Sequence, residues 1–182
     1  TNRETLHCLD LFCGLGGFSA AFEDSDRWGV TTVDIGERFG PDITADVFDL
    51  RPSDFETDFD VILAGFPCDL FSPARNMTEG GDPAWDGDTP ANDVSKDRVA
   101  MLHHTIGLIE GLAPTFWFVE NPIGRMRSLL GHPTGTVTQC QYGRDYQKPT
   151  DLFGEHPPMT YHRCSPGANC HVTTGSYTAG KP

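Results

Sequence analysis

A strand, a glycine turn and a helix follow one another near the start of the sequence, and this succession restricts the fold most strongly. Residues 5–12 (TLHCLDLF) alternate and then become apolar, which is typical of a strand entering a core. The glycines of residues 14–17 (GLGG) interrupt the pattern, and residues 18–24 (FSAAFED) continue with helical spacing. A strand that passes through a tight turn into a helix is a building unit of α/β sheets.

The same alternation continues along the chain. Further strands are predicted at residues 29–34 (GVTTVD), 43–46, 60–66 (DVILAGF) and 115–120 (TFWFVE). Residues 98–112 have apolar side chains at helical spacing, and Pro114 ends this helix. Residues 72–97 predict a long loop, which in a compact domain is usually functional or disordered. We therefore predict an α/β fold with a doubly wound, mostly parallel sheet that binds a ligand along its carboxyl edge.

Length and composition set the domain organisation that we expect. The 182 residues suit one domain, and no apolar run approaches the roughly 20 residues of a membrane span, so we expect a cytoplasmic protein. Beyond Phe153 the sequence is rich in Pro, His, Cys and Gly without periodicity. We place the domain at residues 1–153 and treat 154–182 as a Cys/His/Gly-rich tail.

The charge balance is strongly acidic. Asp and Glu number 26 against 13 Lys and Arg, and the formal net charge is −13. A surface rich in Asp and poor in Lys is typical of proteins that work in high salt, so we expect a halophilic source. Acidity argues against a nucleic-acid partner, but counterion release contributes little in molar salt, where shape, hydrogen bonds and stacking can replace it.

Acids at the ends of two strands favour an adenosyl ligand. The glycine turn lets a nucleoside approach the backbone, Asp34 can accept the hydroxyls of a ribose, and Asp46 can accept an adenine amino group. Each acid alone is more often a solvated strand-end residue. Their order along the chain favours the ligand.

Two other strand ends carry candidate catalytic residues. Pro67 stiffens the exit from an apolar strand and presents Cys68 at the ligand edge, where loop amides can lower its thiol pKa; a structural cysteine is the alternative. Glu120 ends the neighbouring strand, and burial can keep it partly protonated.

These segments together resemble the cytosine-C5 DNA methyltransferase family, and in particular its small phage-borne and archaeal-virus members. DLFCGLGG resembles the cofactor loop, PCDLFS the nucleophile motif Pro-Cys-x-x-Phe-Ser, and VEN the Glu-Asn motif, while the spacing from Arg98 to Asn121 also matches. The resemblance covers residues 6–153. It implies an S-adenosylmethionine-dependent fold and the methylation of double-stranded DNA, as in restriction-modification.

The resemblance also implies roles for individual residues. Cys68 would add to C6 of a flipped-out cytosine, while Glu120 binds N4 and protonates N3; Asn121 would hold the loop that carries Cys68. The implied cofactor residues are Phe12, Gly14, Gly16, Gly17, Asp34, Ile35, Asp46, Val47, Pro67 and Met101. The implied DNA contacts are Ser72, Arg75, Trp85 and Arg98. Arg75 and Trp85 lie in the loop that would close over the base, where a merely solvated loop is the alternative.

The sequence departs from the family pattern in three places. Asp69 stands where glutamine is usual, and Pro122 where valine is usual. The Gln-x-Arg-x-Arg segment is replaced by RDYQKPTDLF, so that Arg144 or Lys148 would have to substitute for its arginine. A separate target-recognition domain and a terminal helix are also absent, which predicts a minimal or truncated enzyme or one completed from elsewhere.

The tail contains a candidate metal site. His162, Cys164, Cys170 and His171, with Cys140 nearby, could form a zinc knot, and we name Cys164, Cys170 and His171 as its ligands. Free surface thiols are the alternative. Two other functions also remain open, namely methylation of cytosine in tRNA and a non-catalytic relic that binds nucleic acid; amino-group methylation is disfavoured because no Asp/Asn-Pro-Pro-Tyr-like segment occurs.

Overall fold

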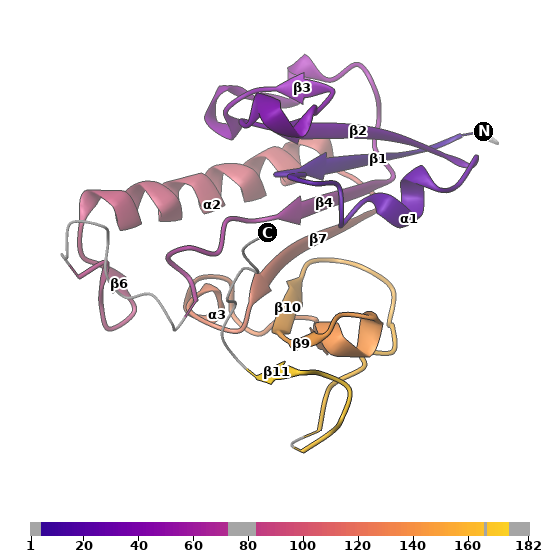
Figure 1. Ribbon diagram of the computed structural model, residues 1–182. Coiled ribbons are helices and arrows are strands. Elements are labelled where there is room, and N and C mark those ends of the chain that lie inside the picture. The colour runs from indigo at the N-terminus through magenta and orange to yellow at the C-terminus, as the bar shows by residue number, and fades with distance from the viewer. Residues whose placement is uncertain (1–4, 73–82, 166, 175–182) are drawn as a thin grey trace.

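A seven-stranded sheet forms the centre of the protein in the computed structural model, which describes residues 5–72, 83–165 and 167–174 (Figure 1). Its strands lie in the order β3-β2-β1-β4-β7-β10-β8. Their bounds are β1 Leu6–Leu11, β2 Trp28–Asp34, β3 Ile43–Thr44, β4 Val61–Gly65, β7 Phe116–Pro122, β8 Gly135–Thr138 and β10 Pro149–Phe153. β1, β2, β3, β4 and β7 are parallel, whereas β10 is antiparallel to both β7 and β8. The predicted doubly wound, mostly parallel α/β sheet is confirmed.

Short elements complete the described part of the chain. Two small sheets pair β5 (Trp85–Asp86) with β6 (Thr89–Pro90) and β9 (Tyr146–Gln147) with β11 (Thr173–Thr174). The helices are α1 Ala20–Glu23, α2 Asp93–Leu112 and α3 Met126–Leu130, and the 3-10 turns are η1 Glu37–Phe39, η2 Val47–Asp49, η3 Pro52–Asp54 and η4 Gln139–Tyr142. Among the residues that the structure describes, we find no helix with the length and apolar character of a membrane span.

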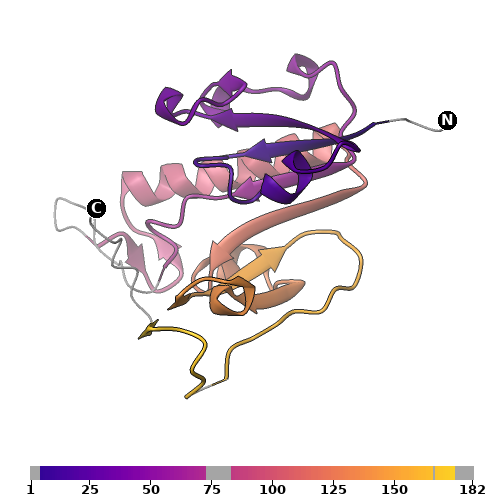
Figure 2. The same cartoon turned by 45° about the vertical axis from the view of Figure 1, so that its right-hand side comes forward.

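The two faces of the sheet are covered unequally. In both views α2 runs along one face and the much shorter α1 lies on the other (Figures 1 and 2). The α2 face buries Leu9, Leu11, Ile62, Leu102, Leu108 and Ile109 in the larger core cluster. The α1 face buries Cys8, Val61 and Leu63, against which Phe18, Phe22 and Trp28 pack. Because both faces of β4 are covered, its sequence is apolar throughout, as expected for a central parallel strand.

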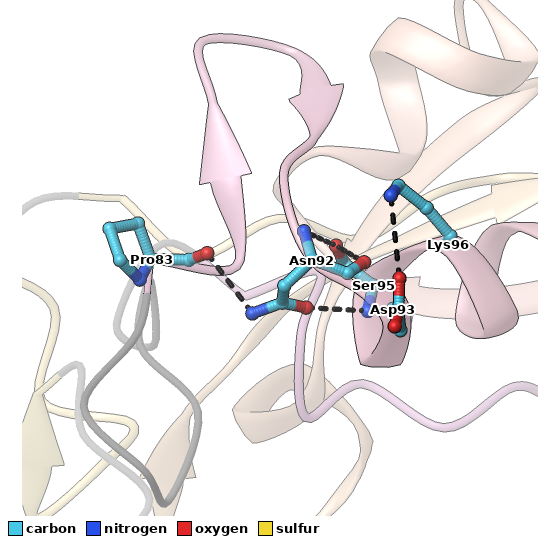
Figure 3. A network of polar contacts seen from close by, with 5 residues as sticks. All are labelled: Pro83, Asn92, Asp93, Ser95 and Lys96. Carbon is cyan, nitrogen blue, oxygen red and sulfur yellow. Dashed lines mark hydrogen bonds and ion pairs between the residues drawn. The ribbon is translucent and has the colours of Figure 1, made fainter.

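Helix α2 begins five residues before the predicted start. Asn92 caps it: its side chain accepts from Ser95 N at 3.0 Å, and Ser95 Oγ accepts from Asn92 N at 3.2 Å (Figure 3). The Asn92 side chain also donates to Pro83 O at 3.0 Å and so fixes the entry of the chain. The apolar periodicity misses this first turn because its residues are polar apart from the exposed Val94. The hairpin of β5 and β6 shortens the predicted loop further.

An ion pair between the buried Asp151 and the exposed Arg127 attaches β10 to α3. Asp151 is fully buried and accepts from Arg127 Nε at 2.6 Å, from Arg127 Nη2 at 2.7 Å and from the Thr136 hydroxyl at 2.7 Å. Replacing Arg127 with methionine is expected to lower the free energy of unfolding by roughly 2–4 kcal/mol, because the carboxylate stays buried with one partner. Urea unfolding checks this, with the exposed Arg27→Met as the control. An equal effect of both changes contradicts the prediction.

Candidate active site

The loop that carries Cys68 is fixed through three of its carbonyl groups. The Asn121 side chain donates to Phe66 O at 2.9 Å, the Trp85 indole to Leu70 O at 2.8 Å, and the Arg125 backbone N–H to Phe71 O at 2.9 Å. Asn121 and Trp85 are buried, so these bonds are shielded from water. Cys68 itself is exposed at the tip of this fixed loop. The loop therefore holds the exposed Cys68 thiol in a fixed position.

Trp85 lies where the sequence did not lead us to expect it. Its side chain is 3% exposed and packs against Phe71, with ring centroids 5.8 Å apart. The Arg125 guanidinium lies over the Trp85 ring at 5.4 Å. The ring is thus part of the core beneath the Cys68 loop, and the expected stacking of Trp85 on DNA is replaced by a supporting role. Burial of the large tryptophan ring in the core is more favourable than its exposure in a solvated loop.

Glu120 reaches the same edge of the sheet from β7. It pairs in register with Gly65, which directly precedes the Cys68 loop, and its side chain is 22% exposed. Lys148 Nζ lies 3.7 Å from Glu120 Oε1. Burial raises the pKa of Glu120, while the Lys148 charge and hydrogen bonds from Lys148 and Thr150 oppose this increase. A carboxyl group placed in this way can retain a proton for donation.

The charges of this edge also act on Cys68. The pKa of the Cys68 thiol is raised, mainly by desolvation and further by Glu120 and Asp69, while the Lys148 charge opposes the increase; the lowering expected from the loop amides is too small to offset it. Lys148 is therefore the nearby cation that favours the thiolate, and the structure places it at the same sheet edge as Cys68 and Glu120. Arg144 is exposed just after η4. Of the two candidate substitutes for the missing arginine, only Lys148 has a recorded contact with Glu120.

A cavity of about 170 Å³ adjoins this edge. It is lined by Leu11, Phe12, Val33, Asp34, Ile35, Ala45, Asp46, Val47, Pro67, Arg98 and Met101. Seven of the ten proposed cofactor residues are among these, whereas the three glycines are not. Leu11, Val33 and Ala45 were not predicted from the sequence, although each directly precedes a predicted cofactor residue. Mostly apolar walls that include two carboxylates suit a flat heterocycle joined to a ribose.

The glycines form the turn beside the cavity. Gly14 and Gly16 have φ of +51° and +74°, a region that favours residues without a Cβ. Gly14 N donates to Asp34 Oδ2 at 2.9 Å, which ties the turn to the end of β2. A Cβ at Gly14 would meet no atom within 4 Å, so the turn is open on that side. The glycines therefore shape the approach to the cavity.

Arg98 connects the cavity with the Cys68 loop. It lines the cavity and pairs with Asp69 at 3.0 Å, in addition to a contact of Nη1 with the Met101 sulfur at 3.5 Å. Asp69, which stands where the family usually has glutamine, thus has a cationic partner. Of the other expected DNA contacts, Ser72 is half-buried at the end of the loop, and Arg75 lies outside the described residues.

Comparisons with known proteins agree with this arrangement. The sequence pattern of the family described as C-5 cytosine-specific DNA methylase matches residues 6–139, so the chain belongs to this family. The type II methyltransferase M.HaeII of Haemophilus aegyptius is 39% identical over 74 residues, which cover 36% of this chain. M.DdeI of Desulfomicrobium norvegicum is 28% identical over 65% of the chain, and M.Bsp6I of a Bacillus species is 26% identical over 75%.

A solved structure supports the fold. A protein described as a DNA modification methyltransferase from an Escherichia coli prophage matches 82% of this chain with a TM-score of 0.57 and 20% identity. The chain spans only part of its relatives' lengths, namely 23% of M.HaeII, 28% of M.DdeI, 41% of M.Bsp6I and 46% of the solved chain.

Proposed function

We propose that the protein transfers a methyl group from S-adenosylmethionine to C5 of cytosine in double-stranded DNA. The observation that carries this proposal is the meeting of Cys68 and Glu120 at one sheet edge, beside a cavity lined by two carboxylates. Membership of the C-5 cytosine-specific DNA methylase family supports the reaction. The description of the family supports DNA rather than tRNA as the substrate. The type II methyltransferases among the relatives support restriction-modification as the setting.

The residues of the cavity fit the proposed cofactor. Asp34 Oδ2 and Oδ1 accept from the N–H groups of Gly14 and Gly36, and each oxygen retains a lone pair for a ribose hydroxyl. Asp46 Oδ1 accepts from Phe48 N, which orients this carboxylate at the rim. When bound, the cofactor supplies an electrophilic methyl group.

The catalytic residues would act in sequence on a flipped-out base. The Cys68 thiolate forms a bond with C6 while Glu120 delivers its proton to N3, so that electrons move to C5. C5 would then attack the methyl group that the bound cofactor supplies. Loss of the C5 proton to a base, with return of the N3 proton to Glu120, would restore the C5–C6 double bond and expel Cys68 as thiolate. Lys148 would favour the thiolate at the first step, because its charge lowers the pKa of Cys68.

An activity assay with two nucleic acids tests the substrate. Duplex DNA and tRNA are each incubated with tritiated S-adenosylmethionine in low and in molar KCl, because the charge of −13 predicts a need for salt. We expect label in DNA alone, with more transfer in molar salt, and bisulfite sequencing should place it at cytosines. Label in tRNA alone contradicts the proposed substrate.

A further inference from the structure

Four metal-ligating side chains converge between η4 and the C-terminal segment. The sulfur of Cys170 lies 3.5 Å from that of Cys140 and 3.4 Å from that of Cys164. His171 Nδ1 lies 3.6 Å from both Cys164 Sγ and Cys170 Sγ. All four ligand atoms lie within 4.8 Å of one another. Cys140 is 24 positions before Cys164 and 30 before Cys170, so the fold has to bring these residues together.

The arrangement suits a tetrahedral ion. Zinc with bonds of about 2.3 Å to sulfur and about 2.0 Å to nitrogen places neighbouring ligand atoms about 3.5–3.8 Å apart. A disulfide between Cys164 and Cys170 would not explain why the Cys140 thiol and the His171 imidazole also lie against these sulfurs. The cysteines of the tail are only half-buried, so packing in an apolar core does not explain their convergence.

The surroundings of the cluster support thiolates. The Gln141 side-chain amide donates to Cys170 Sγ at 3.1 Å, and such hydrogen bonds stabilise metal-bound sulfur. The Cys164 backbone N–H donates to Thr138 Oγ1 at 3.1 Å, which holds this ligand against the end of β8. We propose that Cys140, Cys164, Cys170 and His171 bind one structural zinc ion. His162, which the sequence pattern also offered, is not in the cluster.

The proposed zinc site lies next to the segment that leads to Lys148 at the Cys68–Glu120 edge. Beyond His171 the chain forms β11, which pairs with β9, and in both views this yellow segment runs beside the orange segment of η4 and β9 (Figures 1 and 2). Lys148 directly follows β9, and its carbonyl accepts from Gln139 N at 3.1 Å. The zinc ion would therefore link η4, which precedes β9, to the segment before β11, which pairs with β9, and so hold the stretch that places Lys148 near Glu120.

Metal analysis tests the proposal without relying on methyl transfer. Wild-type protein purified without chelators should contain about one equivalent of zinc, and Cys170→Ser should lose it. His162→Gln is the matched control, and it should keep the metal. Protein without metal, or equal zinc in wild type and Cys170→Ser, overturns the site, as does a Cys164–Cys170 disulfide found by thiol counting under denaturing conditions.

Cobalt substitution gives a second readout that needs no folded variant. Wild-type protein refolded with Co²⁺ in place of zinc should show thiolate-to-cobalt charge-transfer bands and the intense ligand-field bands of a tetrahedral ion. Octahedral cobalt spectra overturn the proposal.

Removal of the metal should also speed trypsin cleavage after Arg163, which precedes the ligand Cys164. An unchanged cleavage rate would show that the ion does not hold this segment in place. Methyl-transfer assays are separate, so a failed function leaves this result interpretable.

Discussion

Replacing Cys68 with alanine is expected to reduce methyl transfer to DNA by about 10⁴-fold or more, because the reaction loses its nucleophile. Without a bond to C6, C5 of cytosine is not electron-rich enough to attack the methyl group. The side chain of Cys68 is exposed, so its removal leaves no cavity and the free energy of unfolding should change little. Single-turnover assays with tritiated cofactor measure the rate.

Two controls separate chemistry from binding and folding. Cofactor affinity, measured by calorimetry, should be unchanged in Cys68→Ala, because Cys68 does not line the cavity. Cys8→Ala removes a buried thiol that has no part in the proposed chemistry and packs on the α1 face of the sheet. The folded fraction of this variant should retain activity. Activity of Cys68→Ala within tenfold of wild type would rule out Cys68 as nucleophile.

The second large effect is expected for Glu120→Gln, with a loss of about 10²–10⁴-fold in kcat. Glutamine can still hydrogen-bond the base, but it has no proton to deliver to N3. Burial raises the pKa of Glu120, so the protonated form persists to higher pH than for an exposed glutamate. The wild-type rate should therefore fall as pH rises through this pKa, and Glu120→Gln should lose that dependence.

Two variants serve as controls for Glu120. Glu110→Gln changes an exposed acid on α2 and should leave the pH profile as it is. Lys148→Met removes a charge that lowers the pKa of both Glu120 and Cys68. The rise of the rate as Cys68 loses its proton and the fall as Glu120 loses its proton should therefore both move to higher pH. A lower kcat in Lys148→Met without these shifts would show that Lys148 acts only structurally.

The positions of the parallel strands along the chain could be predicted because each ends in a recognisable turn or acid, whereas their order in the sheet and the antiparallel β8 and β10 were not predicted. The positions of Asp34, Cys68 and Glu120 at strand ends follow from the same pattern, since parallel strands place their carboxyl ends at one edge. What the sequence could not show is the direction of a side chain in an irregular segment. Trp85 stands among polar residues, yet its ring packs under the Cys68 loop.

Long-range pairing was the other limit. Asp69 and Arg98 are 29 residues apart, and only the fold shows that they form an ion pair. The metal cluster gives a similar case: the sequence offered both His162 and Cys140 beside the three named ligands, and only the structure shows that Cys140 joins them, with its sulfur near that of Cys170 across 30 positions. Such contacts depend on how β8, η4 and the C-terminal segment pack, and this packing leaves no periodic signal in the sequence.

Trapping of the covalent intermediate tests the central claim most directly. Fluorine at C5 of the target cytosine cannot leave as the proton does, so Cys68 cannot be expelled after methyl transfer. Duplex DNA with 5-fluorocytosine and S-adenosylmethionine should therefore give a denaturation-resistant adduct with the wild-type protein, and peptide mapping should place it at Cys68. Cys68→Ser should form none, and Glu120→Gln should form it far more slowly. A wild-type protein that binds cofactor and DNA but traps nothing, or an adduct that persists in Cys68→Ser, would contradict the account.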